Sequence, residues 1–327
     1  MFTCLGIEST AHTFGVGIVS GKKILANEKV SFTSTSAGII PREVARFLDS
    51  HAQGVVAKAL ETAGIGLSDV DLISFAQGPG IGSCLQIGLN HAVALARENE
   101  LPLVGVNHCV AHLEIGRLLC AARDPAFLYA SGANTQVIAF EGGRYRIFGE
   151  TMDVGAGNLL DKFARYIGEG FPGGPRLYEL SLASGPEHFI ELPYAVKGMD
   201  LCFSGLLTDA KKKYDAGARK EDLAYSLQET AFSMLVEVSE RAMAHCGKKE
   251  LLLGGGVGCS KILQEKCRVM CEERGARFYA PPASVLVDNG AMIAWLGVLG
   301  KKNASKKYSA FKPKPFERTD DVEVNWR

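Results

Sequence analysis

The chain has 327 residues, of which 47% are hydrophobic and 22% are charged, so it is long enough for two globular domains of ordinary composition. Lysine and arginine together number 36, as do aspartate and glutamate, and this balance excludes a strong overall electrostatic attraction to nucleic acid. The nine cysteines show no paired CxxC spacing, no secretory leader opens the chain and no apolar run reaches the length of a membrane span, so we expect a cytoplasmic protein without membrane contact.

The first elements form a hairpin with a polar turn. Residues 4–19 predict two apolar strands joined by this turn. Its small hydroxyl residues and glycine leave backbone N–H groups to face an anion, and Glu8 adds a carboxylate that can orient a metal ion or a water molecule. A plain hairpin would explain the same pattern. A third strand at 24–32, a loop at 33–40 and a helix over 41–64 are expected next.

Two histidines mark the end of the first half. A strand at 70–76 enters the glycine-rich junction 77–83, a potential anion site, and a helix to about residue 99 and a strand at Leu103 follow. His108 and His112 then lie four residues apart at the start of a helix and project from one face of it. Neutral imidazole is the commonest side-chain metal ligand, and this spacing lets two rings meet one ion. Alternatively, His108 caps the helix and His112 is an ordinary half-buried histidine.

The second half repeats the opening design. Residues 127–140 again predict a strand, a small polar turn and a strand, and a third strand follows. The likeness to residues 6–19 indicates a weak internal duplication. Two such hairpins facing each other across a cleft would suit a nucleotide held by its phosphates. The sequence alone therefore favours two related α/β halves.

Polar residues and glycines recur at element ends in this half. Asp161 lies one turn inside a helix, either as a solvated carboxylate or as a partner for a ribose or substrate hydroxyl. A long helix is expected at 224–246, and a buried strand from residue 250 runs into three glycines, where backbone can lie against a flat ligand. Asp288, at an expected strand-to-helix junction, supplies the carboxylate that the two histidines lack, or else caps a helix. The tail 301–318 holds seven Lys/Arg and one Glu, a modest basic patch that suits a solvated terminus.

These motifs together resemble a known family. The chain is similar over essentially its whole length to the archaeal/eukaryotic branch of the tRNA threonylcarbamoyladenosine synthase family, formerly described as O-sialoglycoprotein endopeptidase. Eight segments carry the resemblance in one order along the chain: 6–13, 107–112, 129–136, 158–161, 172–175, 203–206, 254–257 and 288–290.

The resemblance implies an actin-like (ASKHA) α/β fold of two related domains with a nucleotide cleft between them. We expect residues 1–122 to form the first half, the tail 302–327 to pack back on it, and residues 123–301 to form the second. It also implies one divalent metal ion, iron or zinc with magnesium as a further possibility, held by His108, His112 and Asp288 with Tyr129 as a nearby or direct ligand. An adenine nucleotide, threonylcarbamoyl-AMP or ATP, is expected along Tyr129, Ala130, Ser131, Gly132, Ala133, Asp161, Gly174, Tyr178 and Ser260.

The implied reaction transfers the threonylcarbamoyl group from threonylcarbamoyl-AMP to N6 of the adenosine 3′ of the anticodon, in tRNAs that read codons beginning with A. The implied partners are the other subunits of the KEOPS complex, including a small protein kinase and a small dimerising subunit, which help to capture tRNA. Two positions depart from the family pattern: it usually has an acidic residue near Tyr178 and an asparagine near Ser260. No residue stands out as the general base.

Three other functions compete with this interpretation. A zinc peptidase needs glutamate directly after the first histidine, and position 109 is cysteine. An ATP-dependent phosphotransferase of the ASKHA class would use both hairpins and the glycine strand, but it gives His108, His112 and Asp288 no shared role. An ATP-binding regulatory scaffold would keep its function without the histidines.

Overall fold

The computed structural model describes residues 1–33 and 40–327. Within them the chain forms two compact units, unit 1 (Met1–Leu119 and Asp288–Arg327) and unit 2 (Cys120–Val287). The loop expected at residues 33–40 lies almost entirely outside the described part of the chain.

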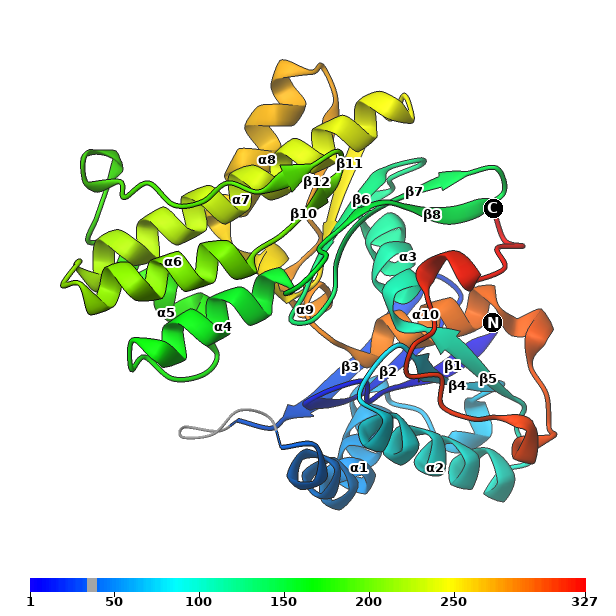
Figure 1. Cartoon of the computed structure of the whole chain (residues 1–327). Helices are drawn as coiled ribbons and strands as arrows, with labels where there is room; N and C mark the ends of the chain where they lie inside the picture. The colour runs from blue at the N-terminus through cyan, green and yellow to red at the C-terminus, as the bar shows by residue number, and fades with distance from the viewer. Residues whose placement is uncertain (34–39) are drawn as a thin grey trace. The chain divides into compact units, whose positions relative to one another are not determined.

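Unit 1 is built on a five-stranded sheet with the strand order β3-β2-β1-β4-β5 (Figure 1). The first three strands pair antiparallel, whereas β4 pairs parallel with β1 and β5 parallel with β4. The strands are β1 (Thr3–Glu8), β2 (Thr13–Ser20), β3 (Lys23–Ser31), β4 (Leu72–Gly78) and β5 (Leu103–Asn107). The predicted hairpin and the three strands after it are confirmed.

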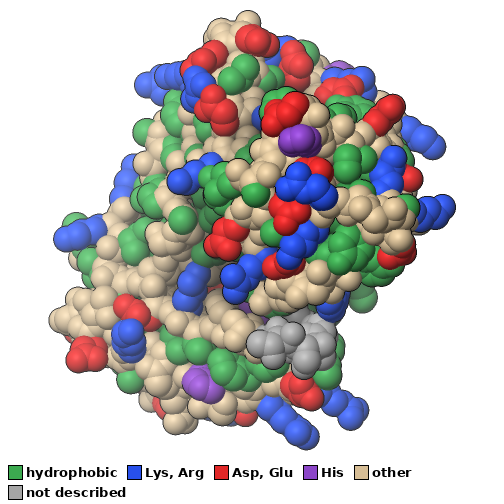
Figure 2. Space-filling view, turned by 90° about the vertical axis from the view of Figure 1, so that its left-hand side faces the viewer, with side chains coloured by type: hydrophobic (Ala, Val, Ile, Leu, Met, Phe, Trp, Pro, Cys, Tyr) green, Lys and Arg blue, Asp and Glu red, His purple; other side chains and the backbone are tan. Residues whose placement is uncertain are grey.

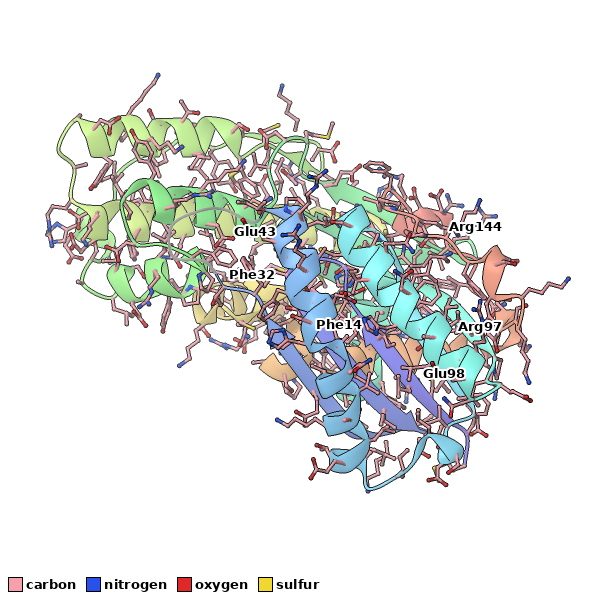
Figure 3. All side chains as sticks on the ribbon, turned by 90° about the horizontal axis from the view of Figure 1, so that it is seen from below. Phe14, Phe32, Glu43, Arg97, Glu98 and Arg144 are labelled. Carbon is pink, nitrogen blue, oxygen red and sulfur yellow. The ribbon has the colours of Figure 1, made fainter. Side chains whose placement is uncertain are left out.

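Helices α1 (Pro41–Ala63) and α2 (Gly82–Glu98) pack on this sheet, as does α10 (Gly290–Leu299). Helix α3 (His108–Cys120) follows β5 and contacts α10, where Trp295 donates to the carbonyl of Glu114. Figure 3 shows α1 and α2 side by side on one face, and Phe14 of β2 meets His91 of α2 edge-on with ring centroids 5.8 Å apart. Successive residues of a strand point to opposite faces. Leu5 and Ile7 therefore join the core cluster that contains Val44 of α1.

Glycines let α10 lie directly on the other face of the sheet. A Cβ built on Gly6 would lie 2.1 Å from the backbone N of Ala294, and one built on Gly17 would lie 2.1 Å from that of Ala291. Ser74 of β4 donates to the carbonyl of Ile293 (2.9 Å). Residues 288–301 were expected in the second half, and the structure places 288–301 in unit 1 instead, because this close packing needs the glycines of β1 and β2.

The C-terminal tail also contacts unit 1. Ser305 forms an antiparallel bridge with Leu103 of β5, and the backbone N of Lys314 donates to the carbonyl of Gln77 at the end of β4 (2.7 Å). Three short 3₁₀ turns lie in the tail: η4 (Lys301–Asn303), η5 (Tyr308–Ala310) and η6 (Thr319–Asp321). One further turn of this kind, η1 (Leu67–Asp69), precedes β4.

Unit 2 has a five-stranded sheet with the order β12-β11-β6-β7-β8. Its strands are β6 (Ala126–Ala130), β7 (Thr135–Glu141), β8 (Arg144–Glu150), β11 (Glu250–Gly254) and β12 (Arg277–Tyr279), and β9 (Val196–Lys197) and β10 (Asp200–Leu201) form a separate small pair. Its helical segments are α4 (Ala156–Tyr166), α5 (Gly173–Ser181), η2 (Pro186–His188), α6 (Ser204–Asp215), α7 (Lys220–His245), η3 (Gly256–Cys259), α8 (Lys261–Glu273) and α9 (Ala283–Leu286). The apolar stripe predicted for the long helix is buried in α7: Leu227, Ala231, Met234, Leu235 and Val238.

The two sheets confirm the internal duplication. In each, three antiparallel strands come first and two parallel strands then extend the far side of the first one. Each also carries a register shift between its second and third strands, at Ile18/Val19 and at Val137/Ile138. The first shift lies beside the turn to β3 and the second at the opposite end of its ladder, so the duplication rests on the shared strand order and not on these shifts.

The surface carries both signs of charge. On the part of the face in Figure 2 that the described residues form, acidic and basic side chains are interspersed, and no broad patch has a single sign. This mixture agrees with the zero net charge of the chain. Among residues 1–33 and 40–327, none of the helices combines the length and the apolar character that crossing a membrane requires.

Candidate metal centre

The helix that carries both histidines starts directly after β5, and Asn107 caps it. Its Oδ1 accepts hydrogen bonds from the backbone N of Cys109 (3.0 Å) and of Val110 (3.1 Å). These bonds satisfy two N–H groups that a helix start leaves unpaired. The alternative in which His108 caps the helix is therefore wrong. His108 is the first residue of α3, and its ring serves other contacts.

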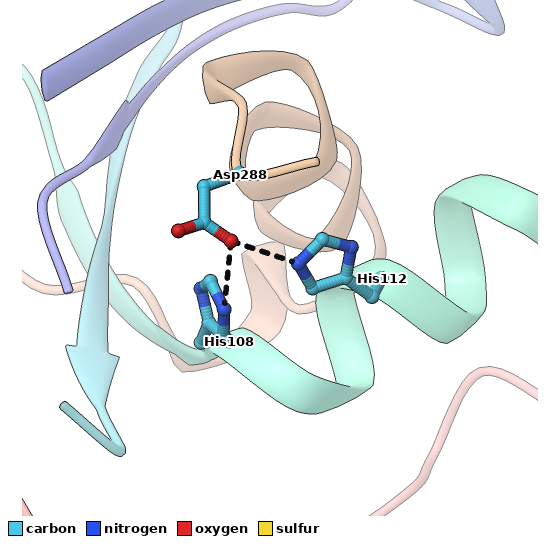
Figure 4. A group of neighbouring side chains, drawn as sticks. All are labelled: His108, His112 and Asp288. Carbon is cyan, nitrogen blue, oxygen red and sulfur yellow. Dashed lines mark hydrogen bonds and ion pairs between the residues drawn. The ribbon is translucent and has the colours of Figure 1, made fainter. Parts of the chain in front are cut away.

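The two histidines and Asp288 come together within unit 1 (Figure 4). Oδ1 of Asp288 lies 3.5 Å from Nε2 of His108 and 3.4 Å from Nε2 of His112. The imidazole rings are 4.8 Å apart and inclined at 85°. Both histidines are buried, and the Asp288 side chain keeps 20% of its surface exposed.

This arrangement fits a metal ion. Two imidazoles and one carboxylate are typical ligands of zinc and iron. Ligand atoms bound at about 2.0–2.1 Å in a tetrahedral site stand roughly 3.3 Å apart. Asp288 meets this separation from both histidines, and the three ligand atoms all lie within 4.8 Å of one another. His108, His112 and Asp288 are therefore suited to hold one ion and leave a coordination position for a further ligand.

Glu8 fixes the orientation of the first histidine. Its Oε2 lies 2.9 Å from Nδ1 of His108, and it is fully buried at the end of β1. Its Oε1 accepts a hydrogen bond from the backbone N of Thr10 (2.7 Å) and another from the Thr10 hydroxyl. A carboxylate on one ring nitrogen directs the other nitrogen to the metal and makes the imidazole a stronger ligand. The interpretation of the first hairpin as plain is wrong, since its turn contributes a carboxylate to this centre.

The charges of the group shift the pKa of each member. Burial acts to lower the pKa of His108, but the charge and hydrogen bond of Glu8 and the charge of Asp288 raise it to about 9. Burial lowers the pKa of His112. Burial acts to raise the pKa of Asp288, and its hydrogen bond to His112 and the charge of His108 outweigh this and lower it. Protons and a metal ion compete for the same imidazole nitrogens, so metal binding releases protons here.

Asp288 follows the short helix α9 and precedes α10. The expected strand-to-helix junction is therefore a helix-to-helix junction. Asn289 caps α10, because its Oδ1 accepts from the backbone N of Met292 (2.9 Å), and this leaves the Asp288 carboxylate to the histidines. Lys29 of β3 donates to the backbone carbonyl of Asp288 (3.1 Å). Lys29 and both asparagine caps were not foreseen, although an asparagine before an apolar helix is a recognisable start signal.

In unit 2, the structure brings several expected nucleotide residues together. The backbone N of Gly157 and of Asn158, at the start of α4, donate to the carbonyls of Ser131 and Gly132 (both 2.9 Å). A Cβ on Gly255, whose φ is +85°, would lie 2.3 Å from the carbonyl oxygen of Ala130. The turn Ala130–Ala133 thus lies against two stretches of glycine backbone. The predicted contact of the glycine strand with a flat ligand stays a prediction.

The remaining expected residues lie around α4, α5 and α8 of the same unit. Asp161 accepts a hydrogen bond from the backbone N of Gly173 (2.7 Å) and so joins α4 to the start of α5, which carries Gly174 and Tyr178. Ser260 caps α8 through a long bond from the backbone N of Leu263 (3.5 Å). Asp161 is thus not a merely solvated carboxylate, and Ser260 has a structural role besides any contact with a ligand.

Tyr129 also belongs to unit 2. It lies in β6, is 1% exposed and stacks on Phe127 with ring centroids 5.9 Å apart. Its expected place beside the metal ion stays a prediction.

Comparison with known proteins gives one family. A family model described as TsaD, tRNA N6-adenosine threonylcarbamoyltransferase, matches residues 23–295. The tRNA N6-adenosine threonylcarbamoyltransferase of Thermococcus kodakarensis is 52% identical over 324 residues, which cover 98% of this chain and 99% of that protein. A probable bifunctional tRNA threonylcarbamoyladenosine biosynthesis protein of Methanocaldococcus jannaschii is 49% identical, and the match covers 99% of this chain and 60% of that protein.

A solved structure shares the fold at low identity. T. kodakarensis HypF matches with a TM-score of 0.63 and 15% identity, over 92% of this chain and 48% of that one. This likeness supports the expected ASKHA fold of two α/β domains and carries nothing about function.

Proposed function

The chain belongs to the TsaD family of tRNA N6-adenosine threonylcarbamoyltransferases, and we propose that it transfers the threonylcarbamoyl group of threonylcarbamoyl-AMP to tRNA. The acceptor is N6 of the adenosine 3′ of the anticodon, in tRNAs that read codons beginning with A. A bond forms between N6 and the carbamoyl carbon, the bond from that carbon to the phosphate oxygen breaks, AMP leaves, and N6 gives up one proton. The observation that carries the proposal is the group His108, His112 and Asp288 in a chain of this family.

An activated acyl donor sets modest chemical demands. The leaving group is already in place, so the protein must hold the carbonyl beside the amine and stabilise the charge that develops on oxygen. His108, His112 and Asp288 would hold a metal ion, and Glu8 would orient the His108 ring through its contact with Nδ1. When bound, the ion supplies a Lewis acid next to the substrate. Burial of both histidines excludes water from the inner side of the centre.

The adenylate would be held by backbone and polar groups of unit 2. We propose the turn Tyr129, Ala130, Ser131, Gly132 and Ala133 for its phosphate side, and Asp161, Gly174, Tyr178 and Ser260 for its sugar and base. The support is physical. Apart from the adjoining chain, a Cβ built on Gly132 or Gly174 would meet no atom of the described residues nearer than 3.8 Å, so there is room for a ligand beside them, and Asp161 already accepts a hydrogen bond at the start of α5.

The metal is proposed to be iron or zinc, one ion per subunit, with Tyr129 as a fourth ligand. The proposed setting is the cytoplasm, in a complex with a small protein kinase and a small dimerising subunit. The bifunctional relative supports such a partnership, because its chain contains substantial sequence beyond the part that matches here. The zero net charge supports help from partners in capturing tRNA.

A reconstituted transfer assay tests the function. The chain and its partner subunits are mixed with threonylcarbamoyl-AMP and unmodified tRNA, and the digested nucleosides are analysed by mass spectrometry. The expected product is threonylcarbamoyladenosine with the wild type and with His91→Ala, a matched histidine control that pairs with Asp49 of α1, and no product with His108→Ala or His112→Ala. Absence of product with the wild type in every partner combination would contradict the transferase. Unchanged product in the two metal-site variants would remove the metal from the reaction.

The alternative functions are not favoured. Relatives that cover nearly the full chain are named transferases, and an ATP-dependent phosphotransferase or a regulatory scaffold leaves the buried histidine pair without a role.

A further inference from the structure

A turn of the C-terminal tail presents one aromatic ring to solvent. Lys314, Pro315, Phe316 and Glu317 form a turn closed by a hydrogen bond from the backbone N of Glu317 to the carbonyl of Lys314 (3.1 Å). Phe316 is 93% exposed, whereas Phe189 in unit 2 is 48% exposed. A lone exposed apolar residue is ordinary. What distinguishes Phe316 is how its turn is held, what charges surround it and where it lies.

The turn is fixed to the end of β4. The backbone N of Lys314 donates to the carbonyl of Gln77 (2.7 Å), and the Gln77 side chain donates to the carbonyl of Lys312 (2.8 Å). The backbone N of Gly80 donates to the carbonyl of Pro315 (3.2 Å). The prolines at 313 and 315 further restrict the backbone. A ring on such a support loses little conformational freedom when it meets a ligand.

Three cations flank the ring, and two of them pair with carboxylates. Lys312, Lys314 and Arg318 flank it, and Glu317 is the one carboxylate in residues 312–318. Lys314 pairs with Glu317 (2.9 Å), and Arg318 pairs with Asp320 (3.1 Å). The Lys312 side chain is exposed, and no carboxylate of the described residues forms an ion pair with it. An aromatic ring among lysines and arginine is the surface that single-stranded nucleic acid uses: bases stack on the ring and phosphates meet the cations.

The turn also lies next to the metal helix. The side-chain N of Asn107 donates to Oε2 of Glu317 (3.1 Å). Glu317 directly follows Phe316, and Asn107 directly precedes His108. This hydrogen bond therefore joins the residue after the ring to the residue before the first metal ligand. A nucleic acid bound at this turn would therefore be close to the metal centre of unit 1.

We propose that Phe316, with Lys312, Lys314 and Arg318, is a stacking platform for an unpaired base of an RNA loop. The identification of that RNA as the anticodon loop of the substrate tRNA rests on the proposed function. The anticodon loop has unpaired bases next to the adenosine to be modified, and bases of this kind stack on aromatic rings. Burial of Phe316 in a protein pocket would also desolvate the flanking cations, so the charges favour RNA as the occupant.

The test measures RNA binding separately from transfer. An anticodon stem-loop RNA with 2-aminopurine at one loop position is titrated with the full chain at low salt, and its anisotropy and fluorescence are followed. Loss of one stacked base weakens binding by roughly 5- to 100-fold, which is the change expected for Phe316→Ala. Phe316→Trp should keep both the affinity and the stacking quench. Phe189→Ala, an exposed phenylalanine flanked by Glu187 and Glu191, is the matched control and should bind as the wild type does.

The lysines give a second readout. Lys312→Ala should lower the slope of log affinity against log salt by about 0.7, the value for one phosphate contact with a single strand. Wild-type protein that fails to bind the stem-loop at low salt would overturn the inference, as would unchanged RNA affinity in Phe316→Ala. If Phe316→Ala no longer bound a partner subunit but kept its RNA affinity, the ring would belong to a protein contact, and this result would also overturn the inference.

The same proteins enter the transfer assay, so the two proposals fail separately. If the wild type transfers the group and Phe316→Ala binds RNA as the wild type does, the stacking platform is rejected and the transferase is retained. Weakened RNA binding in the variant without transfer by the wild type keeps the platform and removes the transferase.

Discussion

Units 1 and 2 share one sheet topology but place different chemistry at corresponding turns. In both, a glycine after the fourth strand lies against the turn between the first two: a Cβ on Gly80 would lie 2.6 Å from the carbonyl oxygen of Thr10, and one on Gly255 would lie 2.3 Å from that of Ala130. Side chains organise the turn of unit 1, where Glu8 binds Thr10 and His108. Backbone closes the turn of unit 2, where the N of Ser131 donates to the carbonyl of Asn134 (2.9 Å).

The comparison shows that two units with the same sheet topology can carry different residues at the same turn. A buried carboxylate needs partners, and in unit 1 it finds them in a threonine and an imidazole that in turn faces Asp288. In unit 2, glycine allows two backbone segments to pack closely without burying a charged side chain. The same turn thus contributes a carboxylate to the histidine–aspartate group in unit 1, and in unit 2 it is closed by backbone where we propose the nucleotide. Changes in unit 2 at positions other than the proposed ligand Tyr129 should leave metal binding by His108, His112 and Asp288 intact.

The largest expected effect is on metal binding in unit 1. His108→Ala and His112→Ala each remove a ligand, so metal affinity should fall by more than about 100-fold, which exceeds the usual effect of losing an outer partner. Metal content after gel filtration, measured by mass spectrometry, checks this. His91→Ala is the matched control, because it makes the same substitution at a histidine of unit 1 that pairs with Asp49; this variant should retain the metal. Full metal content in both ligand variants would show that the ion is bound elsewhere.

A smaller loss is expected when the outer carboxylate of unit 1 changes. Glu8→Gln keeps the shape of the side chain but removes the charge that orients His108, and metal affinity should fall by roughly 10- to 100-fold. Competition with a chelator of known affinity measures the change, with circular dichroism as a check of folding. Ser131→Ala, in the corresponding turn of unit 2, is the matched control and should leave metal affinity unchanged. Equal metal affinities of Glu8→Gln and the wild type would exclude the orienting role.

The third prediction concerns unit 2 and the free energy of unfolding. Gly255→Ala places a side chain at φ +85° and against the carbonyl of Ala130, so stability should fall by at least about 1–3 kcal/mol. Gly256→Ala is a close control, because a Cβ there would meet no atom within 4 Å. Urea denaturation of both variants gives the difference. Metal affinity in Gly255→Ala should stay that of the wild type while the chain is folded, and equal stability of the two variants would refute the close packing.

Much of this arrangement was predictable from the sequence because it depends on local pattern. The alternation of apolar residues and the glycines at strand ends gave the hairpins, and the spacing of His108 and His112 gave their shared helix face. The match between Asp288 and the histidines needs contact across the sequence, which periodicity does not contain. The sequence alone offered Asp288 as the missing carboxylate or as a helix cap, and the family resemblance implied the ligand role; the structure confirms that the three residues meet.

The errors also have physical causes. Residues 288–301 were assigned to the wrong unit because an apolar helix does not specify which sheet it covers, whereas the glycines of β1 and β2 specify where a helix can lie close. The short helix α9 was expected as a strand. Its four residues are too few for the spacing of apolar residues to distinguish a helix from a strand. His108 was a candidate cap, although Asn107 before it is the better residue for that role.

The smallest expected effect tests a residue with two roles in unit 2. Ser260 caps α8 through a bond of 3.5 Å, at the long limit of a hydrogen bond, so Ser260→Ala should lower the free energy of unfolding by only about 0.5 kcal/mol. Asparagine caps helices as well as serine does, so Ser260→Asn should keep that stability. If Ser260 also meets the nucleotide, the alanine variant should weaken adenine-nucleotide binding in calorimetry by more than its stability loss explains, and the asparagine variant should bind at least as tightly as the wild type. Equal nucleotide affinity in all three proteins would restrict Ser260 to capping, and any change in metal affinity would contradict the independence of the two units.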